Sequence, residues 1–130
     1  MALPVVANIE STIETWISLY NSDPHRMIDE CYAKDARVSI PGVLEFSDLE
    51  QLHKAEDAIL KAFPDRRVSL VRSHVFGDEV AVECTFTYGR ADATDAPVSY
   101  FCDIVQFKDG RIISDHIYGA IHPPGVAAEV

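Results

Sequence analysis

The fold is decided by residues 98–118, which read VSYFCDIVQFKDGRIISDHIY. Apolar and polar side chains alternate on both sides of Asp109-Gly110, a dipeptide that favours a tight turn between two strands. The same alternation recurs upstream in the sequence. Four segments are therefore expected to form long antiparallel strands: residues 67–76, 79–88, 98–107 and 111–118.

Three amphipathic helices are expected before these strands, because apolar residues recur there at helical spacing. Asp23 is suited to cap the second helix and Ser47 or Asp48 the third, since their side-chain oxygens can accept a hydrogen bond from a backbone N–H. The helices cover approximately residues 5–21, 24–33 and 48–63.

The remaining segments connect these elements. A short strand is expected at residues 37–40, ended by Pro41-Gly42. Residues 89–96 are expected to form a loop and residues 122–130 an irregular tail. Since no repeat or linker divides the chain, the sequence predicts a single α+β domain over residues 1–130. Its three N-terminal helices would pack into a strongly curved antiparallel sheet, forming a cone-shaped α+β barrel around a cavity.

Composition argues against several classes of function. The 130 residues carry 11 Lys and Arg against 21 Asp and Glu, a net charge of -10 that opposes binding to nucleic acid or anionic membranes. Hydrophobic residues make up 48%, with no run long enough to cross a membrane. The N-terminus lacks the basic region of a secretory signal, so we expect a cytoplasmic protein. The widely spaced Cys31, Cys84 and Cys102 are expected to be unpaired core residues.

Four short motifs in this order resemble the superfamily of ketosteroid isomerases and SnoaL-like polyketide cyclases, whose cone fold was first associated with nuclear transport factor two. The resemblance covers roughly residues 8–120 and implies the fold more strongly than any one activity, because this fold supports many functions. The motifs are Asp23-Pro24, Tyr32-Ala33-Lys34-Asp35-Ala36, Ala62-Phe63-Pro64-Asp65 and Asp103-Ile-Val-Gln-Phe-Lys-Asp-Gly-Arg-Ile-Ile.

The resemblance carries over only some functional residues. Asp103 matches the aspartic acid with which ketosteroid isomerases hydrogen-bond an oxyanion, but Trp16 replaces their tyrosine and Ile40 replaces their proton-shuttling aspartate. Asp103 and Asp115 match the two carboxylates of limonene epoxide hydrolases, whose arginine is replaced by Phe101. Neither steroid isomerisation nor epoxide opening is therefore expected.

Asp103 and Asp115 are the leading candidates for catalysis. Alternation places Asp103 on one face of its strand with Phe101 and Val105, and the resemblance makes this the cavity face and places Asp115 on it too. Burial among apolar side chains should raise the pKa of Asp103, and of two close carboxyls one would act as acid and the other as base. The alternative is a structural Asp103, hydrogen-bonded by Tyr32, and an Asp115 at the wet mouth.

The cavity wall is expected to consist of aromatic and apolar side chains from the helices and the sheet. A plain hydrophobic core is the alternative interpretation of the same pattern. The expected lining residues are Trp16, Tyr20, Tyr32, Phe63, Val82, Cys84, Phe86, Tyr88, Phe101 and Ile117.

His53 is a third candidate catalytic residue. It lies beside the apolar stripe of the third helix, one turn before Glu56 and Asp57, where a carboxylate could orient its ring as a base; the alternative is an ordinary boundary histidine. His116 follows Asp115 but points to the opposite sheet face, so the two cannot share a metal ion. With no phosphate loop or dinucleotide fingerprint either, we expect neither a metal nor a cofactor.

Two functions follow from these residues. The first is a cofactor-independent isomerase or lyase of a small, apolar carbonyl compound, with Asp103 as proton donor and Asp115 or His53 as base. The second is a non-catalytic domain that binds a hydrophobic molecule or mediates dimerisation. The outer sheet face, which includes Tyr100, Ile104 and Tyr118, suits a homodimer interface, and the relatives usually pair through it.

Overall fold

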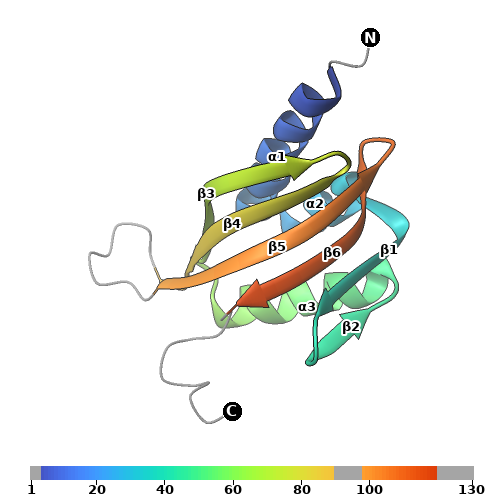
Figure 1. Ribbon diagram of the computed structural model, residues 1–130. Helices are drawn as coiled ribbons and strands as arrows, with labels where there is room; N and C mark the ends of the chain where they lie inside the picture. Colours follow the sequence, from blue (N-terminus) through green and yellow to red (C-terminus); the bar gives the residue numbers. More distant parts are fainter. Residues whose placement is uncertain (1–3, 90–97, 120–130) are drawn as a thin grey trace.

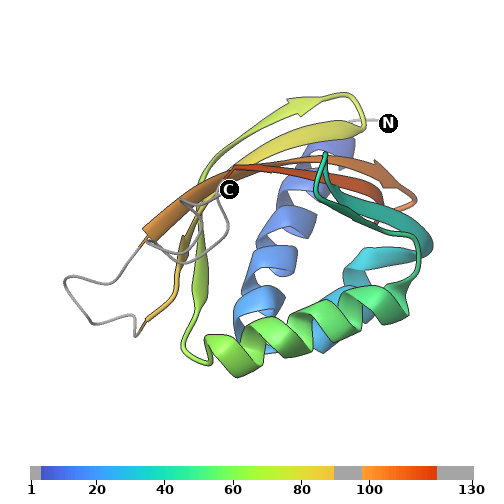
Figure 2. The same ribbon diagram turned by 90° about the horizontal axis from the view of Figure 1, so that it is seen from below.

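The computed structural model describes residues 4–89 and 98–119. Most of the expected loop at 89–96 and the whole expected tail at 122–130 lie outside this part of the chain. Three helices lie on the concave side of a curved six-stranded sheet (Figures 1 and 2), which confirms the α+β class. The helices are α1 (Pro4–Ser22), α2 (Pro24–Cys31) and α3 (Leu49–Ala62).

Six strands follow the order β2-β1-β6-β5-β4-β3 across the sheet. The last four strands form an antiparallel meander, as the period of two predicts. Their bounds are β1 (Tyr32–Ile40), β2 (Leu44–Phe46), β3 (Arg67–Phe76), β4 (Glu79–Thr87), β5 (Val98–Lys108) and β6 (Arg111–Gly119).

The sheet departs from the expected wholly antiparallel barrel in two respects. Strand β1 pairs with β6 in parallel, which is possible because the two strands are far apart in the sequence and no hairpin connects them. The sheet is also open, with β2 and β3 as its two edges. The cone is completed by helices, so the cavity has a sheet wall and a helix wall.

The N-terminal part of the sheet is more extensive than the sequence predicts. Strand β1 begins at Tyr32 and not near Arg37, because Tyr32 already pairs with Ile112 before a register shift. The segment after Pro41-Gly42, expected to be a loop, forms a hairpin to β2. These additions bring Tyr32 onto the sheet.

A bulge in β6 changes which isoleucine is buried. Gln106 pairs with Ser114, whereas Phe107 pairs with Ile112, so Ile113 has no partner in the register. Strict alternation would place Ile113 on the cavity side, yet Ile112 is the fully buried residue. Beyond the bulge the alternation resumes, so Asp115 points inward as expected.

Local signals in the sequence form as predicted. Asp23 accepts a hydrogen bond from the backbone N–H of Arg26 and Asp48 one from that of Gln51, which caps α2 and α3. Asp109 and Gly110 both have positive φ angles, 52° and 80°, as a tight hairpin turn between β5 and β6 requires.

Candidate active site

A cavity of about 340 Å³ lies between the concave sheet face and the helices, within the size range of small-molecule sites. Its wall is almost entirely apolar. Seven of the ten expected wall residues line it: Trp16, Tyr20, Tyr32, Cys84, Phe86, Phe101 and Ile117.

Three expected wall residues do not line this cavity. Val82 is fully buried within the core beneath the sheet. Phe63 packs edge-on against Tyr88, with ring centroids 4.9 Å apart, and the Tyr88 hydroxyl hydrogen-bonds Ser99 at 2.7 Å. Alternation gives the strand face on which Val82 and Tyr88 lie, but it does not show which side chains on that face border the cavity.

The expected wall also omits side chains that the sequence pattern does not reveal. Leu44 and Phe46 line the cavity from β2, a strand that the sequence does not predict. Leu52, Ala55 and Ile59 line it from the apolar stripe of α3. The stripe therefore serves as one wall of the cavity.

Asp103 and Asp115 both point into this cavity. Asp103 pairs with Ile117 across β5 and β6, and Val105 pairs with Asp115, so the two acids are diagonal neighbours on one sheet face. Their exposed fractions are 3% and 1%. The Tyr32 hydroxyl donates a hydrogen bond of 2.7 Å to Oδ2 of Asp115. Tyr32 therefore hydrogen-bonds Asp115, whereas the alternative of a structural Asp103 requires this bond to go to Asp103.

Burial determines how these groups hold their protons. It raises the pKa of Asp103 well above its usual range, and the charge of Asp115 and a hydrogen bond with it raise that pKa further. Burial also raises the pKa of Asp115, while hydrogen bonds from Asp103 and Tyr32 oppose the rise. The pair therefore has Asp103 as the protonated partner and Asp115 as the acceptor.

One oxygen of each carboxyl remains available to a ligand. Among the described residues, neither Oδ1 of Asp103 nor Oδ1 of Asp115 has a hydrogen-bond partner. Buried polar atoms are normally paired, because an unpaired one costs roughly 1–3 kcal/mol. Two such atoms in one apolar cavity form a site that a polar atom of a bound molecule would satisfy.

Cys84 shares the cavity but is a poor nucleophile. Burial and then the nearby charge of Asp103 raise the pKa of its thiol to about 12, so it is not a thiolate at neutral pH. The carboxyls that line the cavity can instead support acid–base chemistry.

Glu56 is a third buried acid, and its role is not apparent from the sequence. It lies on the apolar stripe of α3, lines the cavity and is only 7% exposed. Burial raises the pKa of Glu56 to about 7, although the nearby charge of Arg66 and a hydrogen bond with Tyr20 lower it. The only signal in the sequence is a glutamate at a stripe position, which by itself indicates a partner for His53.

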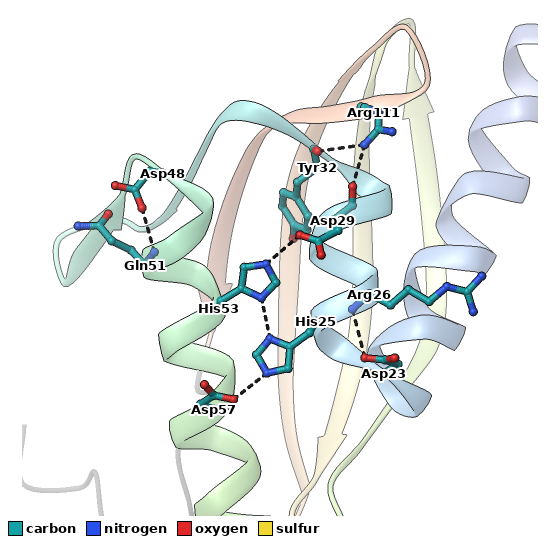
Figure 3. A network of polar contacts seen from close by, with 10 residues as sticks. All are labelled: Asp23, His25, Arg26, Asp29, Tyr32, Asp48, Gln51, His53, Asp57 and Arg111. Atoms are coloured by element: carbon teal, nitrogen blue, oxygen red, sulfur yellow. Dashed lines mark hydrogen bonds and ion pairs between the residues drawn. The ribbon is translucent and has the colours of Figure 1, made fainter.

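His53 lies outside the cavity, on the surface between α2 and α3 (Figure 3). Its Nδ1 lies 2.6 Å from Nδ1 of His25, and its Nε2 lies 2.9 Å from Asp29. Nε2 of His25 lies 2.6 Å from Asp57. Because its ring atoms are engaged away from the cavity, His53 does not take part in the site that Asp103 and Asp115 form.

The two imidazole rings are nearly parallel. Their planes differ by 13°, their centroids lie 4.9 Å apart, and their Nδ1 atoms lie 2.6 Å apart. A hydrogen bond between the two Nδ1 atoms requires one to donate and the other to accept. The contact links α2 to α3.

The described part of the chain lacks some other kinds of site. Within residues 4–89 and 98–119, no three His, Cys, Asp or Glu side chains are grouped so that they could hold a metal ion. No helix in these ranges is long and apolar enough to cross a membrane.

The sequence matches the family model described as SnoaL-like domain over residues 13–114. The chain belongs to the SnoaL-like family. No curated protein sequence matches this SnoaL-like chain.

Solved structures share the fold of this SnoaL-like domain at low sequence identity. A putative SnoaL-like polyketide cyclase from Jannaschia sp. CCS1 matches with a TM-score of 0.75 and 15% identity, covering 92% of this chain and 89% of that one. A protein with a ketosteroid isomerase-like fold from Catenulispora acidiphila, in complex with trimethylamine, matches at 0.72 and 14%, covering 85% of each chain. An LEH-like epoxide hydrolase from M. tuberculosis matches at 0.70 and 14%, covering 88% and 84%. These similarities establish the fold.

The three replaced positions all lie in the cavity of this SnoaL-like domain. Trp16, Ile40 and Phe101 line it at the positions where the sequence resemblance expected a tyrosine, an aspartate and an arginine. Indole can donate a hydrogen bond but cannot titrate, and the other two side chains have no polar atom. The domain thus has a small-molecule cavity whose acids are Asp103, Asp115 and Glu56.

Proposed function

We propose that this protein is a cofactor-independent isomerase or lyase that acts on a small, mostly apolar carbonyl compound. The observation that supports this proposal is the pair Asp103–Asp115, buried in an apolar cavity with one unpaired oxygen on each carboxyl. When Asp103 turns its proton from Asp115 to its unpaired oxygen, a carbonyl oxygen in the cavity can accept that hydrogen bond, while apolar atoms of the molecule contact the aromatic wall.

The chemistry needs only proton transfers. A base removes a proton from the carbon next to the carbonyl, and the electron pair moves to the oxygen, which Asp103 protonates to give an enol. The enol then collapses by returning a proton to another carbon, which is isomerisation, or by expelling a leaving group, which is a lyase reaction. The enol O–H returns its proton to Asp103 as the carbonyl re-forms, and Asp115 accepts the hydrogen bond of the resting Asp103.

A non-catalytic domain that binds a hydrophobic molecule is the second candidate. It is favoured by the apolar side chains Ile40 and Phe101, which line the cavity. They stand at the positions where the resemblance expects the reacting groups of ketosteroid isomerases and limonene epoxide hydrolases. Binding alone would use the same cavity without proton transfer.

Turnover of a β,γ-unsaturated cyclohexenone to its conjugated isomer, followed by ultraviolet absorbance, separates the two candidates. Wild-type protein should catalyse the reaction, and Asp103→Asn should lower the rate by on the order of 100-fold. Asp65→Asn, on the exposed turn after α3, is the matched control and should leave the rate unchanged. Binding of the ketone without turnover, detected through fluorescence of the single tryptophan, Trp16, would favour the second candidate.

We further propose a homodimer through the outer sheet face. Tyr100 and Tyr118 are 64% and 49% exposed on adjacent strands, and the helices all lie on the other side of the sheet (Figure 2). Aromatic side chains are enriched in protein interfaces. Sedimentation should give a dimer for wild type and a monomer for Tyr100→Glu; a wild-type monomer would contradict the proposal.

A cytoplasmic location completes the proposal. Cys31, Cys84 and Cys102 are unpaired, which suits a reducing compartment. Fractionation of cells that express the protein would test this location.

A further inference from the structure

Glu56 faces the Asp103–Asp115 pair from the opposite wall of the cavity. It extends from α3, whereas the two aspartates extend from β5 and β6. The charges of Asp115, Asp103 and Glu56 all contribute to the raised pKa of Tyr32, as expected for acids around one cavity. A molecule held between α3 and the sheet would therefore have an acid on each side.

The carboxylate of Glu56 forms an ion pair with Arg66 but no hydrogen bond to it, and the nearby His25 and His53 also act on its charge. Nη2 of Arg66 lies 3.9 Å from Oε1 of Glu56, an ion pair that is too long for a hydrogen bond. The Arg66 guanidinium instead donates to the backbone oxygen of Tyr20 at 3.0 Å and lies 4.5 Å from the centre of the Tyr20 ring. Within the described ranges, Oε1 of Glu56 has no hydrogen-bond partner.

This arrangement suits a base. The Arg66 side chain, 2% exposed, supplies a buried positive charge that favours the carboxylate, while burial disfavours it. The balance places the pKa of Glu56 at about 7, so both protonation states are populated at neutral pH. A general base is most effective when its pKa lies near the working pH.

We propose that Glu56 is the catalytic base of this cavity and that Arg66 and Tyr20 position and tune its carboxylate. This inference rests on the proposed isomerase or lyase function and supplies the base that it needs. Oε1 of Glu56 removes the proton from the carbon beside the carbonyl, and the C–H electron pair forms the carbon–carbon double bond of the enol. Asp103 gives its proton to the oxygen from the other side.

The proton on Glu56 then completes the reaction. In isomerisation of a β,γ-unsaturated compound it passes to the distal carbon of the dienol, the enol oxygen returns its proton to Asp103, and both acids recover their starting states. In a lyase reaction it passes to a hydroxyl on the β-carbon; the enol O–H returns its proton to Asp103, the carbonyl re-forms, the C–O bond breaks and water departs, which leaves the unsaturated carbonyl compound. No oxidant, reductant or metal is consumed in either sequence.

The other two candidates for the base are less suitable. Asp115 lies on the same wall as Asp103 and already accepts a hydrogen bond from Tyr32. His53 lies outside the cavity, with both ring nitrogens engaged by His25 and Asp29. Glu56 approaches the ligand from the face opposite the acid, which allows proton removal and proton donation in one bound geometry.

Base-promoted ring opening of nitrobenzisoxazole tests this role without knowledge of the natural substrate. A base takes the ring C–H proton, the N–O bond breaks, and a coloured cyanophenolate forms. The wild-type rate should rise with pH through a midpoint at about 7, the pKa of Glu56. Glu56→Gln should lower the rate by on the order of 100-fold. Glu50→Gln, an exposed glutamate on the same helix, should leave the rate and the midpoint unchanged.

A wild type that reacts no faster than its Glu56→Gln variant would overturn the assignment. Asp103→Asn separates this failure from failure of the proposed acid. If only Asp103→Asn loses the rate, Asp103 stands as the acid and Glu56 is not the base. If only Glu56→Gln loses the rate, Glu56 stands as the base and Asp103 is not the acid.

Tyr20→Phe provides a second test, which uses the midpoint of the pH–rate profile and does not require loss of activity. The hydrogen bond with Tyr20 lowers the pKa of Glu56, so its removal should move the midpoint of the rate profile to higher pH. A purely structural Tyr20 would change the rate or the melting temperature without moving the midpoint. An unchanged midpoint in Tyr20→Phe would contradict the tuning role.

Discussion

Two groups of acidic side chains in this domain differ in how the fold surrounds them. Asp103, Asp115 and Glu56 are buried in the cavity, and in the described part of the structure each has one carboxyl oxygen without a hydrogen-bond partner. The side chains of Asp29 and Asp57 are 68% and 69% exposed, yet each accepts a hydrogen bond from a histidine (Figure 3).

Stability alone would favour the opposite arrangement. Water can satisfy an exposed carboxylate at little cost, whereas a buried one needs partners inside the protein. The surface network, which consists of His25, His53, Asp29 and Asp57, links α2 to α3 and is structural. The cavity acids carry a burial cost that no described contact offsets fully. This difference is what the proposed function requires, because a bound molecule would supply the missing partners.

The largest expected effect is on the pH dependence of stability. Burial raises the pKa of Glu56 to about 7 in the folded protein, against an ordinary value of 4.5. Between these values the unfolded chain has released a proton that the folded protein retains, so the free energy of unfolding falls as pH rises. The loss attributable to Glu56 is of order 3 kcal/mol and is complete above pH about 7.

Urea unfolding of wild type and Glu56→Gln from acidic to alkaline pH measures this contribution. The stability of wild type should fall relative to Glu56→Gln across that interval, because glutamine does not titrate. If the free energies of unfolding of the two proteins changed with pH in parallel, Glu56 would behave like an ordinary surface acid. The contrast between the cavity acids and the exposed acids would then not hold.

A smaller effect is expected from Tyr32→Phe. The substitution removes the hydroxyl that donates to Asp115 and leaves a buried carboxyl with one fewer partner. Thermal or urea unfolding should show a loss of roughly 1–3 kcal/mol. Tyr118→Phe, on the exposed outer face, is the matched control and should change stability little. Equal effects of the two substitutions would mean that burial adds nothing to the Tyr32 hydrogen bond.

The surface network should give an effect of about 1 kcal/mol. His25→Gln, His53→Gln and the double variant form a cycle that isolates the Nδ1–Nδ1 contact between α2 and α3. We expect a coupling energy of about 0.5–1.5 kcal/mol and no change in the titration of the cavity aspartates. Additive losses would show that the two rings do not stabilise each other.

The smallest effect is expected for a simple surface ion pair. Lys54 and Glu50 are separated by 3.9 Å on α3, and both side chains are more than three-quarters exposed. Lys54→Met should change stability by less than about 1 kcal/mol, measured by thermal unfolding. A larger loss would imply that exposed pairs of this domain matter as much as the buried ones.

The strands and the face of each acid could be predicted from the sequence, because a period of two and turn residues such as Asp109-Gly110 are local signals. Alternation predicts on which strand face Asp103 and Asp115 lie, and the resemblance to SnoaL-like proteins predicts that these faces border the cavity, which both residues line. The parallel pairing of β1 with β6 could not be predicted, since it depends on contacts far apart in the chain.

Other parts of the site depend on packing between elements. His53 was considered as a base because its neighbours in sequence were visible, whereas its partner His25 comes from α2 and is brought close only by helix packing. Glu56 was considered as a partner for His53, because a helical stripe does not reveal that it borders a cavity. Arg66 is relevant to the site only because the fold buries it beside Glu56.

The most direct test of the central claim is the pKa of Asp103, measured by carbon-detected NMR titration in wild type and in Asp115→Asn. We expect a value well above that of a free aspartate in wild type, raised mainly by burial, and a lower value in the variant because the charge of Asp115 is removed. A value near that of a free aspartate in both proteins would contradict a coupled acid pair in a dry cavity, and with it the proposed chemistry.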